Sequence, residues 1–274
     1  MNILSLFDGI SCGQIALERA DIEVTNYYAS EIKKYAIDVT QDNYPDTIQL
    51  GDVTKIDLTK LPKIDLLMGG SPCQDMSIAM KNREGLAGEK SKLFWEYVRV
   101  LKEVKPKYFF LENVAKANKD DIAVITETLG VEPIRINSKL VSAQLRDRLY
   151  WTNIPNLTQP KDKGILLQDI ITSGYVDKLK SRALVVSESR PLTSRDRMIH
   201  RYKTTGMLTL VFEDINDKEN TCRIFNQTEL ERLQTVPAGY TKILTRNKAA
   251  DVLGDGWTVD VIAHIFKGLK IKEE

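Results

Sequence analysis

Long hydrophobic runs are missing from this chain of 274 residues. No apolar stretch approaches the roughly 18 residues that a membrane-spanning helix requires. The first apolar stretch, residues 2–7, is also too short for a secretory signal peptide, and it follows no basic leader. We therefore expect a cytoplasmic protein with no membrane partner.

Cysteine and histidine are scarce, with three of the former and two of the latter. The cysteines are odd in number and widely scattered, at Cys12, Cys73 and Cys222. This argues against a disulfide framework and for a reducing compartment. The histidines, His200 and His264, are also distant from one another in the sequence. This spacing is not typical of a metal site, and we expect none.

A strong excess of charge of either sign is absent as well. The formal net charge of +1 neither demands nor excludes a nucleic-acid partner. Between residues 177 and 203, however, basic residues outnumber acidic ones by eight to three. Such a local excess is typical of phosphate contact, and the alternative is a solvated surface. The basic residues are Lys178, Lys180, Arg182, Arg190, Arg195, Arg197, Arg201 and Lys203.

What the chain does contain is a regular alternation of short apolar runs and amphipathic stretches over its first 150 residues. This pattern predicts an α/β fold with a mostly parallel, doubly wound sheet and crossover helices. We expect strands at residues 2–7, 24–29, 64–68, 107–111, 132–137 and 148–152. We expect helices at residues 14–20, 31–43 and 91–104, the last with Ser91 as its cap.

Periodicity weakens from residue 155 onward, where Gly, Pro and the basic residues are scattered. We interpret residues 155–225 as a small second region. Helical patterns return at residues 227–234, with Thr228 as a candidate cap, and at 258–269. The predicted division is therefore 1–154, 155–225 and 226–274.

A thiol follows one of the predicted strands. Residues 69–74, Gly-Gly-Ser-Pro-Cys-Gln, come directly after the apolar run 64–68, so Cys73 lies at the carboxyl end of a strand. Ligands and chemistry gather at that edge of an open α/β sheet. A thiol becomes a good nucleophile only when its pKa is lowered or a base serves it. The alternative is a buried structural cysteine.

A glycine-containing turn follows the first predicted strand, at residues 7–13. Glycine allows a tight turn and a close ligand, and the next helix offers amide donors. Glu31 follows the second strand, where an acid suits a ribose diol. Asp52 could accept from an adenine edge, with Val53 against the ring. Ser11 replaces a middle glycine, so S-adenosylmethionine fits better than NAD.

With these motifs in view, the chain resembles the DNA (cytosine-5) methyltransferase family. Seven blocks match in the family's order. Several details resemble the catalytic domains of eukaryotic de novo methyltransferases, and the compact length resembles a phage or bacterial enzyme. Asp255 stands where the family usually has Asn. The blocks are residues 7–13, Glu31, 51–52, 71–74 (Ser-Pro-Cys-Gln), 110–114 (Phe-Leu-Glu-Asn-Val), 144–148 (Gln-Leu-Arg-Asp-Arg) and 254–259 (Gly-Asp-Gly-Trp-Thr-Val).

The resemblance implies a Rossmann-like methyltransferase that transfers a methyl group from S-adenosyl-L-methionine to C5 of a flipped-out cytosine in duplex DNA. Cys73 would attack C6, and Glu112 would protonate N3. Arg148 would contact O2, and Arg146 would hold the Cys73 loop or the charge of the adduct. The product would be S-adenosyl-L-homocysteine, and water would accept the C5 proton.

The resemblance also implies two sets of binding residues and leaves alternatives open. The alternatives are a tRNA substrate, a non-catalytic cofactor-binding module and, from the glycine turn alone, an oxidoreductase. We expect a monomer or weak oligomer in a bacterial or phage-infected cell. Residues 77–90 would close over the base.

The expected cofactor residues are Phe7, Asp8, Gly9, Ile10, Gly13, Glu31, Ile32, Asp52, Val53, Pro72, Asp255 and Trp257. The expected substrate residues are Gln74, Ser77, Asn113, Gln144, Arg195, Arg197 and Arg201.

Overall fold

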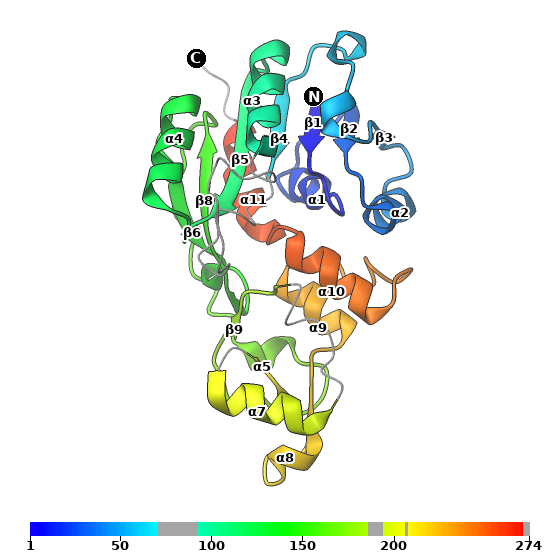
Figure 1. Cartoon of the computed structure of the whole chain (residues 1–274), viewed down its shortest axis with the longest axis vertical. Helices are drawn as coiled ribbons and strands as arrows, with labels where there is room; N and C mark the ends of the chain where they lie inside the picture. The colour runs from blue at the N-terminus through cyan, green and yellow to red at the C-terminus, as the bar shows by residue number, and fades with distance from the viewer. Residues whose placement is uncertain (71–91, 186–193, 206–207, 271–274) are drawn as a thin grey trace. The chain divides into compact units, whose positions relative to one another are not determined.

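The computed structural model describes residues 1–70, 92–185, 194–205 and 208–270 (Figure 1). The chain forms two compact units, and each is made of separate pieces of sequence. The first consists of Met1–Ile136, Asp147–Gln159 and Ile262–Glu274, and the second of Asn137–Arg146 and Pro160–Val261. The predicted domain boundaries at residues 154 and 225 stay a prediction, because a compact unit of contacts is not the same as a functional domain.

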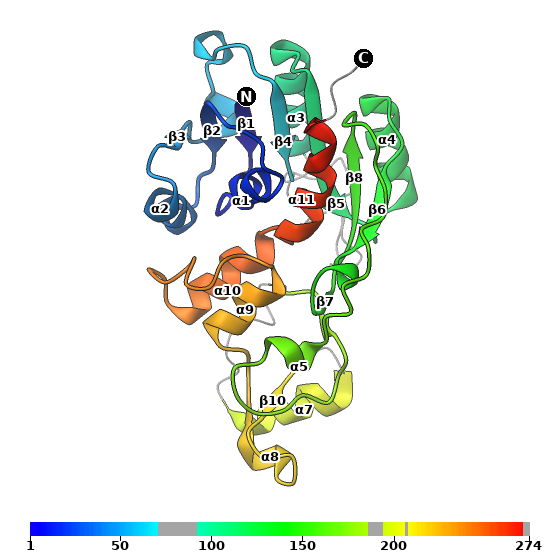
Figure 2. The ribbon, with the colours of Figure 1, turned by 180° about the vertical axis from the view of Figure 1, so that it is seen from behind.

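A seven-stranded sheet with the order β3-β2-β1-β4-β5-β8-β6 forms the centre of the first unit (Figure 2). The pairs among β3, β2, β1, β4 and β5 are parallel, and β5 pairs with β8 in the antiparallel sense. The predicted mostly parallel α/β fold is thereby confirmed. The strands are β1 (Asn2–Leu6), β2 (Asn26–Ser30), β3 (Ile48–Gln49), β4 (Leu66–Gly69), β5 (Tyr108–Val114), β6 (Ile134–Asn137) and β8 (Asp147–Thr152).

Helices cover both faces of this sheet, which is why its central strands are almost continuously apolar. All of β4 is buried. On one face, Leu67 and Leu111 pack into a core with α3 and α4. On the other, Phe110 of β5 lies against Phe266 of α11, with 5.3 Å between ring centroids. The helices are α1 (Cys12–Arg19), α2 (Lys34–Asn43), α3 (Lys92–Val104), α4 (Lys119–Leu129) and α11 (Val259–Phe266).

Helix α4 was not among the helices expected from the sequence, although it carries clear end signals. The side chain of Asn118 accepts a hydrogen bond from the Asp120 backbone N–H at 3.3 Å. Gly130 ends the helix at φ 68°, a left-handed conformation that favours glycine. The Asn-to-Gly spacing was therefore the signal that could have found it.

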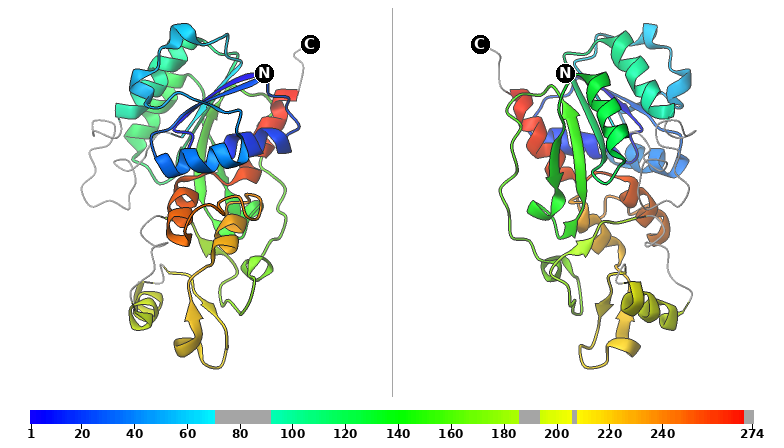
Figure 3. Two further views of the ribbon diagram at one scale, coloured as in Figure 1. Left: turned by 90° about the vertical axis from the view of Figure 1, so that its right-hand side faces the viewer. Right: turned by 60° about the vertical axis from the view of Figure 1, so that its left-hand side comes forward.

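The second unit is built from short elements. Two small sheets pair β7 with β9 in parallel and β10 with β11 antiparallel, the latter as a narrow ribbon in Figure 3. Buried Leu208, Leu210, Phe212 and Cys222 form a core under α7. The elements are α5 (Leu167–Ile170), α7 (Arg195–Thr205), α8 (Lys218–Thr221), α9 (Gln227–Leu233), α10 (Arg246–Asp255), β7 (Gln144–Leu145), β9 (Ser181–Arg182), β10 (Val211–Phe212) and β11 (Cys222–Arg223).

The predicted helices near the C-terminus are present, with one correction. Asn226, not Thr228, caps α9, because its side chain accepts from the Glu229 N–H at 3.0 Å. The Glu229 carboxylate accepts in return from the Asn226 N–H at 2.8 Å, which completes a capping box. Thr228 lies inside the helix. In the described part of the chain, no helix is both long and apolar enough to cross a membrane.

Candidate active site

A tight turn follows β1 at the carboxyl edge of the sheet. Phe7, Gly9 and Ser11 all adopt positive φ angles, of 57°, 60° and 55°. Two of these three residues are not glycine, and such a conformation persists only where the surroundings fix it. The turn leads directly into α1, so the predicted glycine turn has the strand-to-helix setting expected for a ligand-binding loop.

The carboxyl group of Asp8 is what fixes this turn. It accepts hydrogen bonds from the Tyr27 hydroxyl at 2.7 Å and from the Ser11 hydroxyl. Thr40 donates in turn to Ser11 at 3.2 Å. Burial raises the pKa of Asp8 above its usual value, and these hydrogen bonds oppose that shift only in part. The Asp8 side chain therefore stabilises the turn from inside.

Gly13, another predicted cofactor residue, has a packing reason to be glycine. A Cβ atom at this position would lie 2.4 Å from the Met68 side chain of β4. The missing side chain lets α1 approach the sheet closely. Ile10, a further predicted cofactor residue of the same turn, is fully buried.

Glu31 follows β2 and reaches back to the turn. One of its carboxylate oxygens accepts from the Gly9 N–H at 2.8 Å, and the other accepts from the Ile32 and Lys33 N–H groups, both at 2.8 Å. About four lone pairs are available on a carboxylate, so room is left for a ligand hydroxyl. The Ile32 side chain beside it is 75% exposed, an apolar surface that suits the face of a purine ring.

The loop after β3 contributes the third part of this edge. The Ser30 hydroxyl donates to the Gly51 carbonyl at 2.7 Å and ties the loop to β2. One Asp52 oxygen accepts from the Thr54 N–H at 3.0 Å and the Thr54 hydroxyl at 2.8 Å. These hydrogen bonds, the backbone one first, lower the pKa of Asp52. The side chain of Val53 is buried next to it.

These three loops lie together because β1, β2 and β3 are parallel neighbours whose carboxyl ends share one edge. An adenosine presents a ribose diol, a ring face and an amino edge. An acid suits the ribose, an exposed aliphatic side chain suits the ring face, and a second acid suits the amino edge. The residues of this edge therefore fit an adenosine-containing cofactor, and they form no Gly-rich cradle for a pyrophosphate.

A second group of predicted residues lies on β5 and β8. Glu112 stands opposite Tyr150, and Val114 opposite Arg148, so Glu112 and Arg148 are diagonal neighbours on one face. The Arg148 Nε atom lies 2.6 Å from Glu112 Oε1, and the two side chains are only 15% and 11% exposed. Removal of one partner from such a nearly buried pair would leave the other charge uncompensated, which is strongly destabilising.

The same sheet register relates this pair to the predicted nucleophile. Gly69, the last residue of β4, pairs with Leu111, the residue before Glu112. Cys73 follows Gly69 by four residues in the sequence. Cys73 itself, with Pro72, Gln74 and Ser77, lies outside the described residues, as do Ser91, Arg190 and the loop 77–90. Asn113 is buried and accepts from the Val114 N–H at 2.7 Å, so it shapes the strand end.

Gln144 and Arg146 belong to the second unit. The Gln144 side chain donates to the Leu233 carbonyl at 2.6 Å and to Gln234 Oε1 at 2.8 Å. The Arg146 guanidinium donates to backbone carbonyls, of which Gly256 is nearest at 2.9 Å. Both side chains are buried. Asp255 at the end of α10 is exposed, and Trp257 is buried in the same unit.

Apart from Arg182, which lines the hollow described below, the described basic residues of the segment 177–203 form two groups. Lys178 donates to the Leu208 carbonyl at 3.0 Å, and Lys203 pairs with Glu219. Lys180 donates to three backbone carbonyls, including that of Ser142 at 2.9 Å, and burial lowers its pKa. These three lysines thus have structural partners that no sequence signal revealed.

The arginines of α7 form the other group. Met198, Ile199 and Tyr202 pack this helix onto the core of the second unit. Arg197 and Arg201 are four residues apart and therefore lie on one face of the helix. Arg195 and Arg197 are exposed. This face of α7 is the part of the basic segment that fits phosphate contact.

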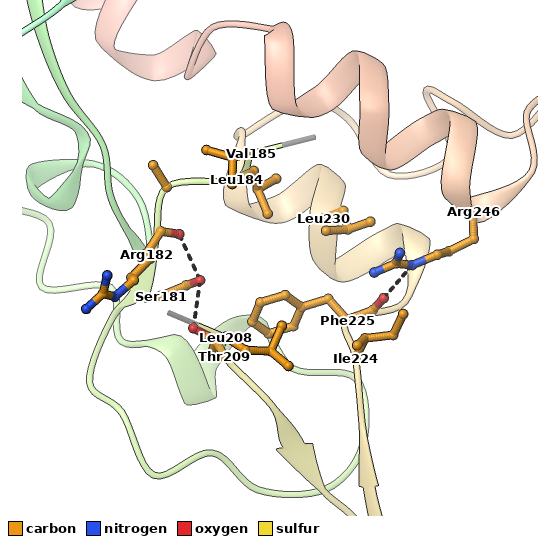
Figure 4. Close-up of a pocket in the computed structure, with 11 residues that line it drawn as sticks. Ser181, Arg182, Leu184, Val185, Leu208, Thr209, Ile224, Phe225, Leu230 and Arg246 are labelled. Carbon is orange, nitrogen blue, oxygen red and sulfur yellow. Dashed lines mark hydrogen bonds between the residues drawn. The ribbon is translucent and has the colours of Figure 1, made fainter. Parts of the chain in front are cut away.

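The second unit also contains a hollow that the sequence did not indicate (Figure 4). Its volume is about 30 Å³, and its walls are mainly apolar side chains from β9 and the residues after it, from the segments just before β10 and just after β11, and from α9. Arg246 lines it, donates to the Phe225 carbonyl at 2.9 Å, and has a pKa lowered to about 10 by burial. Within the described residues, no cluster of three His, Cys, Asp or Glu side chains could hold a metal ion.

Residues 1–154, which carry the turn, Glu31, Asp52, Glu112 and Arg148, match the family model for C-5 cytosine-specific DNA methylase. The chain belongs to this family. The family predicted from the seven sequence blocks is thereby confirmed. The matched residues contain all the strands from β1 to β8.

Two curated relatives of this chain come from a phage and a bacterium. The orphan methyltransferase M.SPRI of Bacillus phage SPR is 37% identical over 166 residues, 56% of this chain and 38% of that protein. The type II methyltransferase M.NgoBV of Neisseria gonorrhoeae is 33% identical over 199 residues, 64% of this chain and 47% of that protein. The chain thus spans less than half the length of these relatives.

Solved structures with the same fold match almost the entire chain. The Entamoeba histolytica methyltransferase EhMeth has a TM-score of 0.73 at 18% identity, with 99% of both chains covered. A Spodoptera frugiperda DNMT2 mutant has a TM-score of 0.68 at 16% identity, covering 98% of this chain and 99% of the other. At these identities the likeness shows the fold, and it confirms the methyltransferase architecture predicted from the sequence.

Proposed function

We propose that this protein transfers a methyl group from S-adenosyl-L-methionine to C5 of a cytosine in double-stranded DNA. The observation that carries the proposal is the buried Glu112–Arg148 pair, which lies next to the end of the strand that leads to Cys73. Family membership supplies the class of reaction, and this pair supplies groups that suit the cytosine ring.

The methyl donor would occupy the edge formed by the loops after β1, β2 and β3. Glu31 would accept a ribose hydroxyl, Ile32 and Val53 would contact the adenine, and Asp52 would accept its amino group. When bound, S-adenosyl-L-methionine supplies an electrophilic methyl group. The remaining residues of the proposed donor site are Phe7, Gly9, Ile10, Pro72, Asp255 and Trp257 as contacts, and Asp8 and Gly13 as residues that hold the loop.

Cytosine C5 needs activation before it can accept a methyl group. The Cys73 thiolate would form a bond to C6, and the electron pair of the C5–C6 double bond would move toward N3, where Glu112 delivers a proton. Arg148 would donate to O2 and stabilise the developing charge. C5 would then take the methyl group, which leaves S-adenosyl-L-homocysteine. C5 would lose its proton to water, the thiolate would leave C6 as the C5–C6 double bond re-forms, and Glu112 would take back the N3 proton.

A cytosine inside a duplex is out of reach of these groups, so the base must leave the stack. The arginines Arg195, Arg197 and Arg201 of α7 would contact the phosphate backbone or base edges. Gln74, Ser77, Asn113 and Gln144 complete the proposed substrate set. The same chemistry would also act on a cytosine in tRNA, and the experiment below separates the two substrates.

The decisive experiment follows tritiated methyl groups from S-adenosyl-L-methionine into duplex DNA and into tRNA. We expect transfer to DNA, and we expect Cys73→Ala to lower it by more than about 10³-fold while Cys222→Ala, a buried cysteine of the second unit, leaves it intact. Glu112→Gln should lower the rate by roughly 10²–10⁴-fold, since it removes the acid proton. Transfer that survives in Cys73→Ala would contradict the mechanism, and transfer to tRNA alone would contradict the substrate.

A duplex with 5-fluorocytosine at the target gives an independent reading. Fluorine at C5 replaces the proton that must leave, so the covalent complex should persist on a denaturing gel. Cys73→Ala should form none. A persistent complex in that variant would assign the nucleophile to another residue.

A further inference from the structure

The ribbon formed by β10 and β11 carries helix α7 on one of its faces. Phe212 of β10 and Cys222 of β11 lie in the buried core of the second unit, and Tyr202 of α7 packs against this core. The rings of Phe212 and Tyr202 meet edge to face, with 5.7 Å between their centroids. The orientation of α7 within the second unit therefore depends on how this ribbon is fixed to the rest of that unit.

The side chain of Arg223 leaves the ribbon on the opposite face. Arg223 lies between Cys222 and Ile224, which both pack in the core under α7, and successive side chains of a strand point to opposite sides. Its guanidinium donates to Glu229 of α9 through both terminal nitrogens, at 2.8 and 2.9 Å. Such a bidentate pair fixes the direction of the contact as well as its distance.

The same guanidinium reaches two further segments of the second unit. Its Nε atom pairs with Glu213, the residue after β10, at 2.5 Å, and a terminal nitrogen donates to the Ser173 carbonyl at 2.7 Å. The Ser173 hydroxyl donates in turn to Glu213 at 3.3 Å. Arg223 thus joins both strands of the ribbon to α9 and to the turn at residue 173. Only the planar fork of an arginine, with its five N–H donors, can do this.

Glu229 is the fixed end of this network. Its side chain is fully buried, and it also accepts from the Asn226 N–H at 2.8 Å and the Thr172 N–H at 3.0 Å. Burial acts to raise the pKa of Glu229, but the hydrogen bonds, that of Arg223 first, more than offset this and lower the pKa. The carboxylate therefore stays charged and holds the ribbon through Arg223.

We propose that Arg223 is a positioning residue for nucleic-acid binding: by clamping the ribbon to α9 it sets the orientation of α7, and with it the direction of Arg197 and Arg201. The inference rests on the proposed function, which gives the arginines of α7 the contact with DNA. Arg223 acts through the ribbon, and its own guanidinium stays with its protein partners when DNA binds.

The test compares two affinities in the full chain, that for a labelled duplex by fluorescence anisotropy and that for S-adenosyl-L-homocysteine by calorimetry. Arg223→Lys keeps the charge and loses the fork, so we expect the Kd of the duplex to rise about tenfold. The Kd of S-adenosyl-L-homocysteine and the single-turnover rate at saturating DNA should each stay within about twofold of the wild type. An unchanged Kd for the duplex, or an equal rise in both Kd values, would overturn the proposal.

Glu213→Ala separates positioning from charge and does not depend on the fold tolerating a change at Arg223. Removal of a negative charge would by itself strengthen binding to a polyanion. The proposal expects the opposite, a Kd for the duplex raised about threefold, because Arg223 loses one of its acceptors. The Glu213 side chain is 46% exposed, so the buried core stays unchanged. Stronger or unchanged binding of the duplex would overturn the inference.

Arg232→Lys is the matched control, because it makes the same exchange on α9 at an arginine that donates to the Ile170 carbonyl, at 2.9 Å, and not to the ribbon. It should leave the Kd of the duplex within about twofold of the wild type. An equal loss of affinity in Arg232→Lys would overturn the proposal. A wild type that neither binds nor methylates DNA would instead contradict the proposed function, so the two failures are distinguishable.

Discussion

At the scale of single residues, the side chains of the edge proposed to bind the methyl donor divide into those that would face a ligand and those that hold the loop. Asp8 and Gly13 are in the second group, because Asp8 binds Tyr27 and Ser11 and Gly13 makes room for Met68. Glu31 holds the turn through the Gly9 N–H, and in the proposed function it also binds the ribose. A motif can therefore identify the loop correctly without telling which of its residues touch the ligand.

Asp8→Asn should change how stability depends on pH. The raised pKa of Asp8 means that the folded state holds this proton more tightly than the unfolded chain does. The contribution of Asp8 to stability is thus present in full below the unfolded pKa of about 3.8 and is lost as the pH rises through the folded value. Asn does not ionise, so the variant should lose less stability than the wild type between pH 4 and pH 7.

Urea denaturation at both pH values measures this difference directly, because other titrating groups are common to the two proteins. An equal pH dependence in wild type and variant would show that Asp8 does not titrate in this range. Asp8 would then lose its assignment as the buried acid of the turn.

At the scale of elements, the predicted strands of the sheet and the first three helices are present, since each depends on local periodicity and on burial of a whole face. The predictions that failed or fell short concern ends and partners. Thr228 was the wrong cap, and α4 was not expected. The partners of Lys180 and Arg146 come from segments distant in sequence, and no pattern within one segment specifies them.

Asn226→Ala and Thr228→Ala form a matched test of the α9 cap. We expect Asn226→Ala to destabilise the protein by about 1–2 kcal/mol, since it removes the capping box and its bond to Thr172. Thr228→Ala should change stability by less than about 0.5 kcal/mol. Thermal unfolding of both variants checks the order, and the reverse order would restore Thr228 as the cap.

At the scale of the whole molecule, a net charge of +1 hides a strongly uneven distribution. Lys178, Lys180 and Lys203 are engaged with protein partners. Arg195 and Arg197 of α7 are exposed, and under the proposed function we expect affinity for DNA to depend on the arginines of α7 more than on these lysines.

Arg197→Gln combined with Arg201→Gln should weaken DNA binding at low salt by about tenfold or more and reduce the slope of log K against log salt by about 2. Lys203→Gln, whose ammonium already pairs with Glu219, is the control and should have a smaller effect on both quantities. Fluorescence anisotropy with a labelled duplex over a salt series measures them. Equal effects of the arginine and lysine changes would remove the α7 face as the contact surface.

The division of the second unit into two pieces of sequence has a consequence for protein engineering. Residues 137–146 contribute β7, Gln144 and Arg146 to that unit, while the rest comes from 160–261. A graft that exchanged only 160–261 between relatives would separate α10 from the guanidinium that caps it and β9 from the strand it pairs with. An exchange that keeps the second unit intact must therefore carry both pieces and leave the intervening strand, with Arg148, in place.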